Sequence, residues 1–289
     1  MTTTVKKRSR RFRNSVCSPT RRLGRYTCYT DETLMSMKKR WDARHPDVPI
    51  KAETPRGIWN ELKRNMGDVC DTERCWLRQH FMKGHVDSTL KSFTFAPSAP
   101  ASWKKKPDEW LTSLDIDRVM KQWERKHKEF EFIGPSPIDF DERMAEGECV
   151  WNELCKFDLA RSLKRGKKIT GIIFNLDPHY KSGSHWVAMH VDVPRAIVFY
   201  FDSNGDPAPS QVKTLAERII GQGKELGIEL KFVQNHPVEH QRGNTECGIY
   251  TLYVLTQLLA GKKTYKSFMG DRIPDEKMFS LRKQYFNED

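Results

Sequence analysis

The first third of the chain has its hydrophobic residues at helical spacing. Over residues 31–85 large apolar side chains recur at intervals of three or four, which places them on one face of a helix. These positions are Leu34, Met37, Trp41, Ile58, Trp59, Leu62 and Met66. Thr30 or Asp31 is the expected N-cap of the first helix. The pattern predicts a helical domain over residues 29–95.

The rest of the chain mixes helical spacing with short apolar runs bounded by turn residues. The predicted strands cover residues 169–176, 186–193, 196–201 and 229–233. The predicted helices cover residues 115–130, 210–223 and 247–259. Strands placed beside helices in this way indicate an α+β or α/β fold.

A stretch rich in Pro, Ala and Ser separates these two parts. Residues 95–103 read Phe-Ala-Pro-Ser-Ala-Pro-Ala-Ser-Trp, and three lysines and a proline follow. This composition is typical of a linker. The predicted divisions are an arm at 1–28, a helical domain at 29–95, a linker at 96–109 and a second domain at 110–289.

Positive charge is concentrated at the N-terminus. The net charge is +12, and the first thirty residues hold nine Lys and Arg and no acid. Subtracting these nine leaves about +3 for the rest, which indicates a basic arm and not a nucleic-acid-binding fold. We expect the arm to be disordered, and a solvated tail, a nuclear-import signal and a phosphate-backbone binder all fit it. Its candidate phosphate contacts are Lys6, Lys7, Arg8, Arg10, Arg11 and Arg13.

The composition indicates a folded protein made without export. No run approaches the roughly 20 apolar residues that cross a bilayer, and the N-terminus lacks an apolar signal core. Seven cysteines in such a chain are expected to be mostly reduced, without a disulfide scaffold. No metal site is predicted at Cys70 and Cys75, because no second cysteine pair follows them. Buried thiols are expected there and at Cys149 and Cys155.

Cys247 is the first residue of a predicted helix and follows a polar loop. Backbone N–H groups and the helix dipole at such a position stabilise a thiolate. Gly248 would allow a substrate backbone to approach closely. Gln241 lies six residues before the cysteine and could donate its amide to an oxyanion beside the Cys247 N–H. From this segment alone, a nucleophile and a buried structural cysteine are both open.

His185 and Asp202 are the candidate partners of this cysteine. His185 opens a predicted strand, where it could serve as a base for a nucleophile from another element, whereas His190 lies deeper in the strand. Asp202 ends the next strand and could accept the imidazole N–H, which would fix the tautomer. A turn-capping role for Asp202 is the alternative, and Asn204 is the second candidate for the orienting group.

Several segments together carry a family resemblance. They are Gly183-Ser-His-Trp-Val-Ala, Tyr200-Phe-Asp-Ser-x-Gly205, His240-Gln-Arg-x-x-Thr-Glu-Cys-Gly248, Pro137-Ile-Asp-Phe140 and Cys70-Asp-x-Glu-x-Cys75. In combination they resemble the SUMO-protease and adenain superfamily of cysteine peptidases. Within it they resemble the African swine fever virus type of polyprotein protease of large nucleocytoplasmic DNA viruses. The resemblance covers about residues 30–289.

The resemblance implies a fold and a set of site residues. The fold is a papain-like or adenain-like core, a mixed sheet flanked by helices, with an N-terminal helical domain. The implied triad is His185, Asp202 and Cys247. The swine fever virus type carries Asn in place of Asp202 and Gln in place of Asn244, so the oxyanion amide is open between Gln241 and Asn244.

Two tryptophans extend the implied site. In the cellular branch of the family, aromatic residues cover a narrow channel that accepts a Gly-Gly stretch, since a Cβ would collide with the rings. Trp186 and Trp110 resemble those residues, and ordinary core packing is the alternative for both.

Three functions follow as hypotheses. The first is a thiol endopeptidase that cleaves viral core polyproteins, after Gly-Gly-x, during virion maturation, with no cofactor and no membrane partner. Such an enzyme is expected in the virion and the host cytoplasm at virus factories, with the nucleus also open and DNA contact through the arm. The second is a deconjugating protease for a host ubiquitin-like modifier. The third is a basic nucleic-acid-binding protein on an inactive protease fold.

Overall fold

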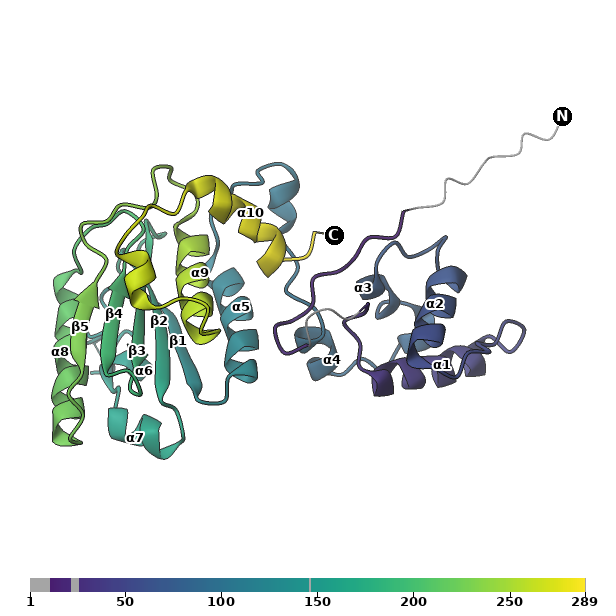
Figure 1. Cartoon of the computed structure of the whole chain (residues 1–289), viewed down its shortest axis with the longest axis horizontal. Helices are drawn as coiled ribbons and strands as arrows, with labels where there is room; N and C mark the ends of the chain where they lie inside the picture. The colour runs from purple at the N-terminus through teal and green to yellow at the C-terminus, as the bar shows by residue number, and fades with distance from the viewer. Residues whose placement is uncertain (1–10, 22–25, 146, 289) are drawn as a thin grey trace. The chain divides into compact units, whose positions relative to one another are not determined.

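The computed structural model describes residues 11–21, 26–145 and 147–288. The chain forms two compact units, shown in Figure 1. The helical unit comprises residues 1–98 and 283–289, and the sheet unit comprises residues 99–282. The division after Ser98 lies within the predicted linker 96–109, whereas residues 283–289 group with the helical unit.

A five-stranded mixed sheet forms the centre of the sheet unit, with the strands in the order β1-β2-β3-β4-β5. The strands are β1 (Phe130–Pro137), β2 (Ile169–Asn175), β3 (Trp186–Asp192), β4 (Ile197–Phe201) and β5 (Lys231–Gln234). The pairs β1–β2 and β4–β5 are parallel. The pairs β2–β3 and β3–β4 are antiparallel. Hairpin neighbours in the middle therefore bring the start of β3 close to the end of β4.

Helices cover both faces of this sheet (Figure 1). Val187, Met189 and Val191 of β3 pack into one apolar cluster with residues of α8 (Ser210–Glu225). The other face is covered by α5 (Ser113–Lys126) and α9 (Cys247–Leu259), which contact β1 and β3. Every residue of β3 and β4 is buried, which explains why β4 is a continuous apolar run and why β3 is mostly apolar.

The remaining elements of the sheet unit are short. They are η2 (Ala101–Lys104), α6 (Asn152–Cys155), α7 (Leu159–Lys164), η3 (Tyr265–Phe268) and α10 (Asp275–Tyr285), whose last residues group with the helical unit. The predicted α+β class, a mixed sheet flanked by helices with further helices at the N-terminus, is confirmed. No helix in the described ranges is long and apolar enough to cross a membrane.

One strand differs from the prediction. The helix expected to run to residue 130 ends at Lys126, and β1 begins at Phe130. The helix starts at a capping box, in which Thr112 accepts from the Asp115 N–H and the Asp115 carboxylate accepts from the Thr112 N–H. β1 was missed because its Gly134-Pro135 pair resembles a chain break.

The helical unit follows its hydrophobic pattern. Its elements are α1 (Asp31–Arg44), α2 (Pro55–Asn65), α3 (Glu73–Trp76), η1 (His80–Met82) and α4 (Ser88–Phe93). Thr30 caps α1 by accepting from the Thr33 N–H, and Thr54 caps α2 by accepting from the Gly57 N–H. All seven apolar positions predicted from the spacing are buried in one core. The existence of helices at the N-terminus is therefore confirmed.

The prediction of reduced cysteines is wrong. Six of the seven cysteines form the disulfides Cys17–Cys28, Cys70–Cys75 and Cys149–Cys155, and Cys247 is the free thiol. The fold holds the paired Cα atoms 5.2, 5.4 and 6.3 Å apart, within the range that a disulfide spans. The expectation of reduced thiols rested only on the predicted lack of export. The spacing of the cysteines along the chain does not reveal which of them lie close together in the fold. Because Cys70 and Cys75 bond to each other, neither thiolate is available to a metal.

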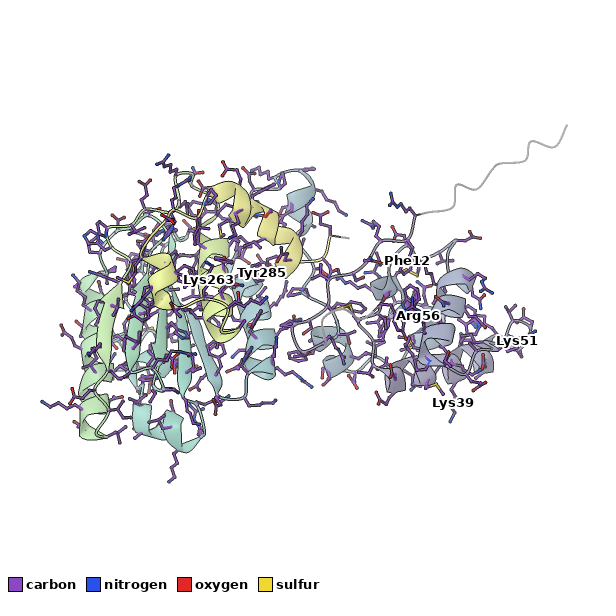
Figure 2. The ribbon with its side chains drawn as sticks, in the orientation of Figure 1. Phe12, Lys39, Lys51, Arg56, Lys263 and Tyr285 are labelled. Carbon is purple, nitrogen blue, oxygen red and sulfur yellow. A yellow bond between two sulfur atoms is a disulfide. The ribbon has the colours of Figure 1, made fainter. Side chains whose placement is uncertain are left out.

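Within the predicted arm at 1–28, residues 11–21 make specific contacts with other parts of the helical unit. The Phe12 ring, labelled in Figure 2, packs edge-on against Trp59 at 5.7 Å between centroids. Arg13 pairs with Asp71 at 2.9 Å while half of its side chain stays exposed, and Arg11 is exposed. A basic composition favours disorder, but Phe12 anchors this segment in the core of the helical unit. The candidate phosphate contacts Lys6, Lys7, Arg8 and Arg10 lie outside the described residues.

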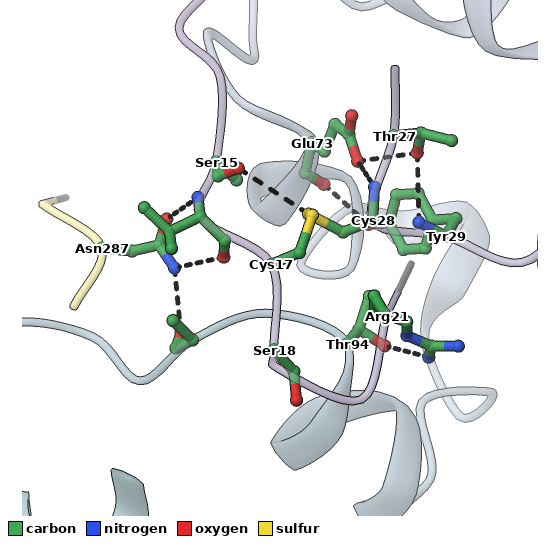
Figure 3. Close-up of a disulfide and its surroundings, with 12 residues drawn as sticks. Ser15, Cys17, Ser18, Arg21, Thr27, Cys28, Tyr29, Glu73, Thr94 and Asn287 are labelled. Carbon is green, nitrogen blue, oxygen red and sulfur yellow. Dashed lines mark hydrogen bonds between the residues drawn. A yellow bond between two sulfur atoms is a disulfide. The ribbon is translucent and has the colours of Figure 1, made fainter. Parts of the chain in front are cut away.

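Hydrogen bonds of Asn287 join this segment to other parts of the helical unit (Figure 3). The Asn287 Nδ2 donates to the Val16 and Ala96 carbonyls at 2.9 Å, and its Oδ1 accepts from the Val16 N–H at 2.7 Å. Glu73 is buried beside the Cys17–Cys28 disulfide. The residues near the two chain ends therefore share one small core.

Glu73 satisfies donors from three parts of the helical unit. Its carboxylate accepts from Thr27 Oγ1 at 2.8 Å, from the Cys28 N–H at 3.1 Å and from Trp59 Nε1 at 3.0 Å. Burial raises the pKa of Glu73, although these hydrogen bonds oppose the rise. Removing the carboxylate would leave all three donors buried without an acceptor.

We expect Glu73→Ala to lower the free energy of unfolding by about 2–4 kcal/mol, because it orphans buried donors. Urea unfolding followed by tryptophan fluorescence measures this. Asp47→Ala removes an exposed carboxylate from the same unit and should change stability by less than about 0.5 kcal/mol. Equal effects of the two substitutions would contradict the role assigned to Glu73.

Candidate active site

The sheet and α9 bring Cys247 and His185 together. Cys247 is the first residue of α9 and is 1% exposed. His185 directly precedes β3, and its pKa responds to a hydrogen bond with the Cys247 side chain. A thiol at a helix N-terminus that faces an imidazole is the arrangement of an activated nucleophile.

Asp202 holds the imidazole from the opposite side. His185 Nε2 lies 2.7 Å from Asp202 Oδ1, and the two side chains are 12% and 1% exposed. Antiparallel pairing of Ala188 with Phe201 places the residue after β4 beside the first residues of β3. Since Nε2 faces Asp202, Nδ1 is the nitrogen left for the cysteine.

A second set of hydrogen bonds fixes Asp202 itself. Its Oδ1 also accepts from the Asn204 N–H at 2.8 Å, so the contact of Asn204 with Asp202 is made by backbone. The Asp202 N–H donates to Asn235 Oδ1 at 2.8 Å, and Asn235 Nδ2 donates to the Asp202 carbonyl at 2.7 Å. Asp202 therefore both caps its turn and binds His185. His190, the weaker histidine candidate, lies in mid-strand 3.7 Å from Asp192.

Opposing effects set the pKa of His185. Burial lowers it, whereas hydrogen bonds to Asp202 and Cys247 and the charges of both groups raise it to about 10. The imidazolium is therefore the favoured form at neutral pH. A positive charge held there stabilises a thiolate on Cys247.

Gln241 and Asn244 differ in how firmly they are held. Gln241 is 4% exposed; its Oε1 accepts from Ser203 Oγ at 2.8 Å, and its Nε2 donates to the Gly243 carbonyl at 2.8 Å. One N–H of this amide remains for another acceptor. The Asn244 side chain is exposed. Gln241 is therefore the amide that the fold orients.

Gly248 and Trp186 both contact Leu111. A Cβ on Gly248 would approach the Leu111 side chain to 3.0 Å, so this glycine allows α9 to pack against residue 111. Trp186 is buried and donates Nε1 to the Leu111 carbonyl at 3.0 Å. Trp110 is 38% exposed.

A cleft of about 540 Å³ opens beside both tryptophans. Its lining includes Trp110, Leu111, Asn175, His179, Gly183 and Trp186. Trp186, which follows His185 in the chain, is the lining residue next to that histidine. Within the described ranges, no cluster of three or more His, Cys, Asp or Glu could hold a metal ion.

Residues 106–289 match the Ulp1 protease family, C-terminal catalytic domain. The chain belongs to the Ulp1 protease family. It is therefore a cysteine peptidase, and the resemblance inferred from the motifs is confirmed.

Two viral proteins are similar over most of their length. The predicted thiol protease of Acanthamoeba polyphaga mimivirus is 25% identical over 266 residues, covering 90% of this chain and 84% of that protein. The SUMO-1 cysteine protease of African swine fever virus is 26% identical over 238 residues, covering 78% and 85%. The crystal structure of an African swine fever virus protease aligns with a TM-score of 0.65 at 20% identity, over 95% of this chain and 96% of that one, which shows a shared fold.

This Ulp1-family site contains a buried ion pair that was not predicted. Glu246, one residue before the cysteine, pairs with Arg282 of α10 at 2.9 Å, and both side chains are at most 4% exposed. Arg282 also donates to the carbonyls of Glu109 at 2.7 Å and Thr245 at 3.2 Å. A charged residue directly before a buried helix was the available signal, because a buried carboxylate requires a partner.

Asp275, the first residue of α10, is a second anchor that was not predicted. Its Oδ2 accepts from the N–H groups of Arg242 and Gly243 at 3.0 and 2.9 Å, and its Oδ1 accepts from Tyr250 Oη at 2.8 Å. Burial raises the pKa of Asp275, but these hydrogen bonds and Arg272 outweigh it and lower the pKa below its usual value. The ionised carboxylate thus anchors the loop that follows Gln241.

We expect His185 to titrate near pH 10, and Asp202→Asn or Cys247→Ala to lower its pKa by about one or more, because each removes a contact that raises it. NMR of the imidazole ring measures this. His127, whose pKa is lowered by burial and by Lys126, is the internal control and should not change. A wild-type His185 that titrates near pH 6.5 would contradict an imidazolium held between Asp202 and Cys247.

We expect Asp275→Ala to lower kcat on a peptide substrate roughly 10-fold, because the loop carrying Gln241 loses its anchor. Steady-state kinetics measures this. Glu276→Ala removes the next carboxylate of α10, which is exposed, and should leave kcat unchanged. Equal activity of the two variants would show that Asp275 does not position the loop.

Proposed function

We propose that this chain is a viral thiol endopeptidase that cleaves core polyproteins after Gly-Gly-x during virion maturation. The observation that carries the chemistry is the 2.7 Å hydrogen bond from His185 to Asp202, with Cys247 on the other side of the ring. The two similar proteins come from large DNA viruses, and both are named as proteases.

Each residue of the site has a step. The Cys247 thiolate attacks the scissile carbonyl carbon, and a C–S bond forms as the carbonyl oxygen becomes an oxyanion. Gln241 Nε2 and the Cys247 N–H are the donors proposed for that oxyanion. His185 gives its proton to the leaving amine as the C–N bond breaks, and an acyl-enzyme remains. A water oxygen then attacks the acyl carbon while the neutral imidazole takes a proton from that water. The C–S bond breaks, which releases the acid and restores the Cys247 thiolate and the His185 imidazolium.

The cleft supports a substrate with small residues before the cleaved bond. Trp110 and Trp186 line it, and Trp186 adjoins His185. A chain that passes between such rings needs residues without a Cβ, and Gly-Gly satisfies this. We further propose that the enzyme acts in the virion and in the host cytoplasm where virions assemble.

A second substrate deserves a direct test. The African swine fever virus relative is named a SUMO-1 cysteine protease, and ubiquitin-like modifiers also end in Gly-Gly. The same chemistry would then remove a modifier from a host protein. Labelling with electrophilic modifier probes separates the two substrates.

We expect the purified chain to cut a core polyprotein and expose new N-termini after Gly-Gly-x, which N-terminal sequencing identifies. Cys247→Ala should lower kcat/KM by roughly 10⁴-fold or more, because the attacking atom is lost. Lys224→Ala, an exposed substitution on α8, should cleave normally. Equal cleavage by the wild type and Cys247→Ala would refute the proposal. Adducts of Cys247 with ubiquitin-like probes, without polyprotein cleavage, would replace it with deconjugation.

A further inference from the structure

A second cavity of the sheet unit is strongly basic. It has a volume of about 400 Å³ and lies between η3 and the first turn of α10. We call it the basic pocket; its charged and hydroxyl lining residues are Lys263, Lys266, Ser267, Asp271, Arg272 and Lys277. Lys263 is labelled in Figure 2. Four basic side chains and one acidic side chain line the cavity, so its lining carries an excess of positive charge.

Three of these cations are not neutralised by the protein. Among the residues that the structure describes, Lys263, Lys266 and Lys277 make no ion pair. Lys277 Nζ lies 5.3 Å from the Tyr253 ring centroid, and Lys263 Nζ lies 5.9 Å from that of Phe268. The rings hold the stems of these side chains in place without cancelling their charge.

Arg272 is the one lining cation with a carboxylate partner. It lies 3.5 Å from Asp275 Oδ2, which also accepts from the N–H groups of Arg242 and Gly243. That oxygen already accepts from two backbone N–H groups, and the Arg272 contact is longer than either of them. The guanidinium therefore retains donors for a further acceptor.

The basic pocket is separate from the substrate cleft. Its lining residues come from positions 263–277, and none of them lines the cleft beside Trp110 and Trp186. Hydrogen bonds nevertheless connect the segment that lines it to His240, which precedes Gln241. His240 binds the Phe268 carbonyl through Nε2 at 2.9 Å and the Ile273 N–H through Nδ1 at 3.1 Å.

We propose that the basic pocket binds a phosphate-bearing ligand. Lysine ammonium groups act as point charges toward phosphate oxygens, and an arginine fork binds two of them at once. The volume lies within the range of small-molecule sites. A free polyphosphate and a nucleic-acid backbone present the same chemistry, and the experiment separates these two sources.

The test uses the full chain with Cys247→Ala, so binding is measured without proteolysis and independently of the proposed substrate. One variant carries Lys263→Gln, Lys266→Gln and Lys277→Gln. Its matched control carries Lys213→Gln, Lys224→Gln and Lys231→Gln, which remove the same charge from exposed positions on α8 and β5. Sodium tripolyphosphate and a 12-base-pair DNA duplex are titrated by calorimetry at low salt.

We expect the pocket variant to lose about 10-fold or more in affinity for at least one of the two probes, and the control variant to stay within about 2-fold. Loss of tripolyphosphate binding identifies a free polyphosphate as sufficient. Loss confined to the duplex, with a salt slope lower by about one for each lysine removed, identifies a nucleic-acid backbone. No binding of either probe, or equal binding by both variants, would overturn the proposal.

A footprint on the unaltered lysines keeps the test decisive if the pocket variant does not fold. Acetylation with an amine-reactive ester, read by mass spectrometry, compares lysines with and without tripolyphosphate or duplex. Protection is expected at Lys263, Lys266 and Lys277 and not at Lys213 or Lys224. Uniform modification with both probes would refute the site.

Discussion

The antiparallel register of β3 and β4 is the constraint on which the geometry of the candidate active site depends. Ala188 pairs with Phe201. His185, just before β3, and Asp202, just after β4, therefore lie at the same end of these two strands. A slip of one residue would turn every side chain to the opposite face and separate His185 from Asp202. Because both strands are buried on both faces, such a slip would also move Val187, Met189 and Val191 out of the apolar cluster that they share with α8. Core packing therefore enforces the 2.7 Å hydrogen bond.

The C-terminal helix completes what the sheet begins. Cys247 and Gln241 lie at the two ends of a short loop, and loops lose their geometry unless something holds them. α10 supplies Asp275 to one part of that loop and Arg282 to the other. The Arg282–Glu246 pair is shielded from water, so each of its charges depends on the other. The active site thus depends on residues more than thirty positions beyond the loop they hold.

Prediction from sequence succeeded where one short-range rule decided the outcome. Apolar spacing located the helical core, continuous apolar runs located β3 and β4, and strand ends located His185 and Asp202. It failed where two distant segments decide the outcome together. Asp275 and Arg282 are ordinary charges on a polar helix until the fold brings the loop to them. The cysteine pairs were missed for the same reason, since only folding brings Cys17 to Cys28.

Charge shows this limit most clearly. The N-terminal arm contains most of the excess positive charge, yet Arg13 in that segment is matched by Asp71. The sheet unit has a far smaller excess, but Lys263, Lys266 and Lys277 converge on one hollow with a single lining acid. Anion binding depends on local, uncompensated charge within a few ångströms, because salt screens the rest. The composition of a chain therefore gives its total charge, whereas the fold determines which charges lack a partner and can bind an anion.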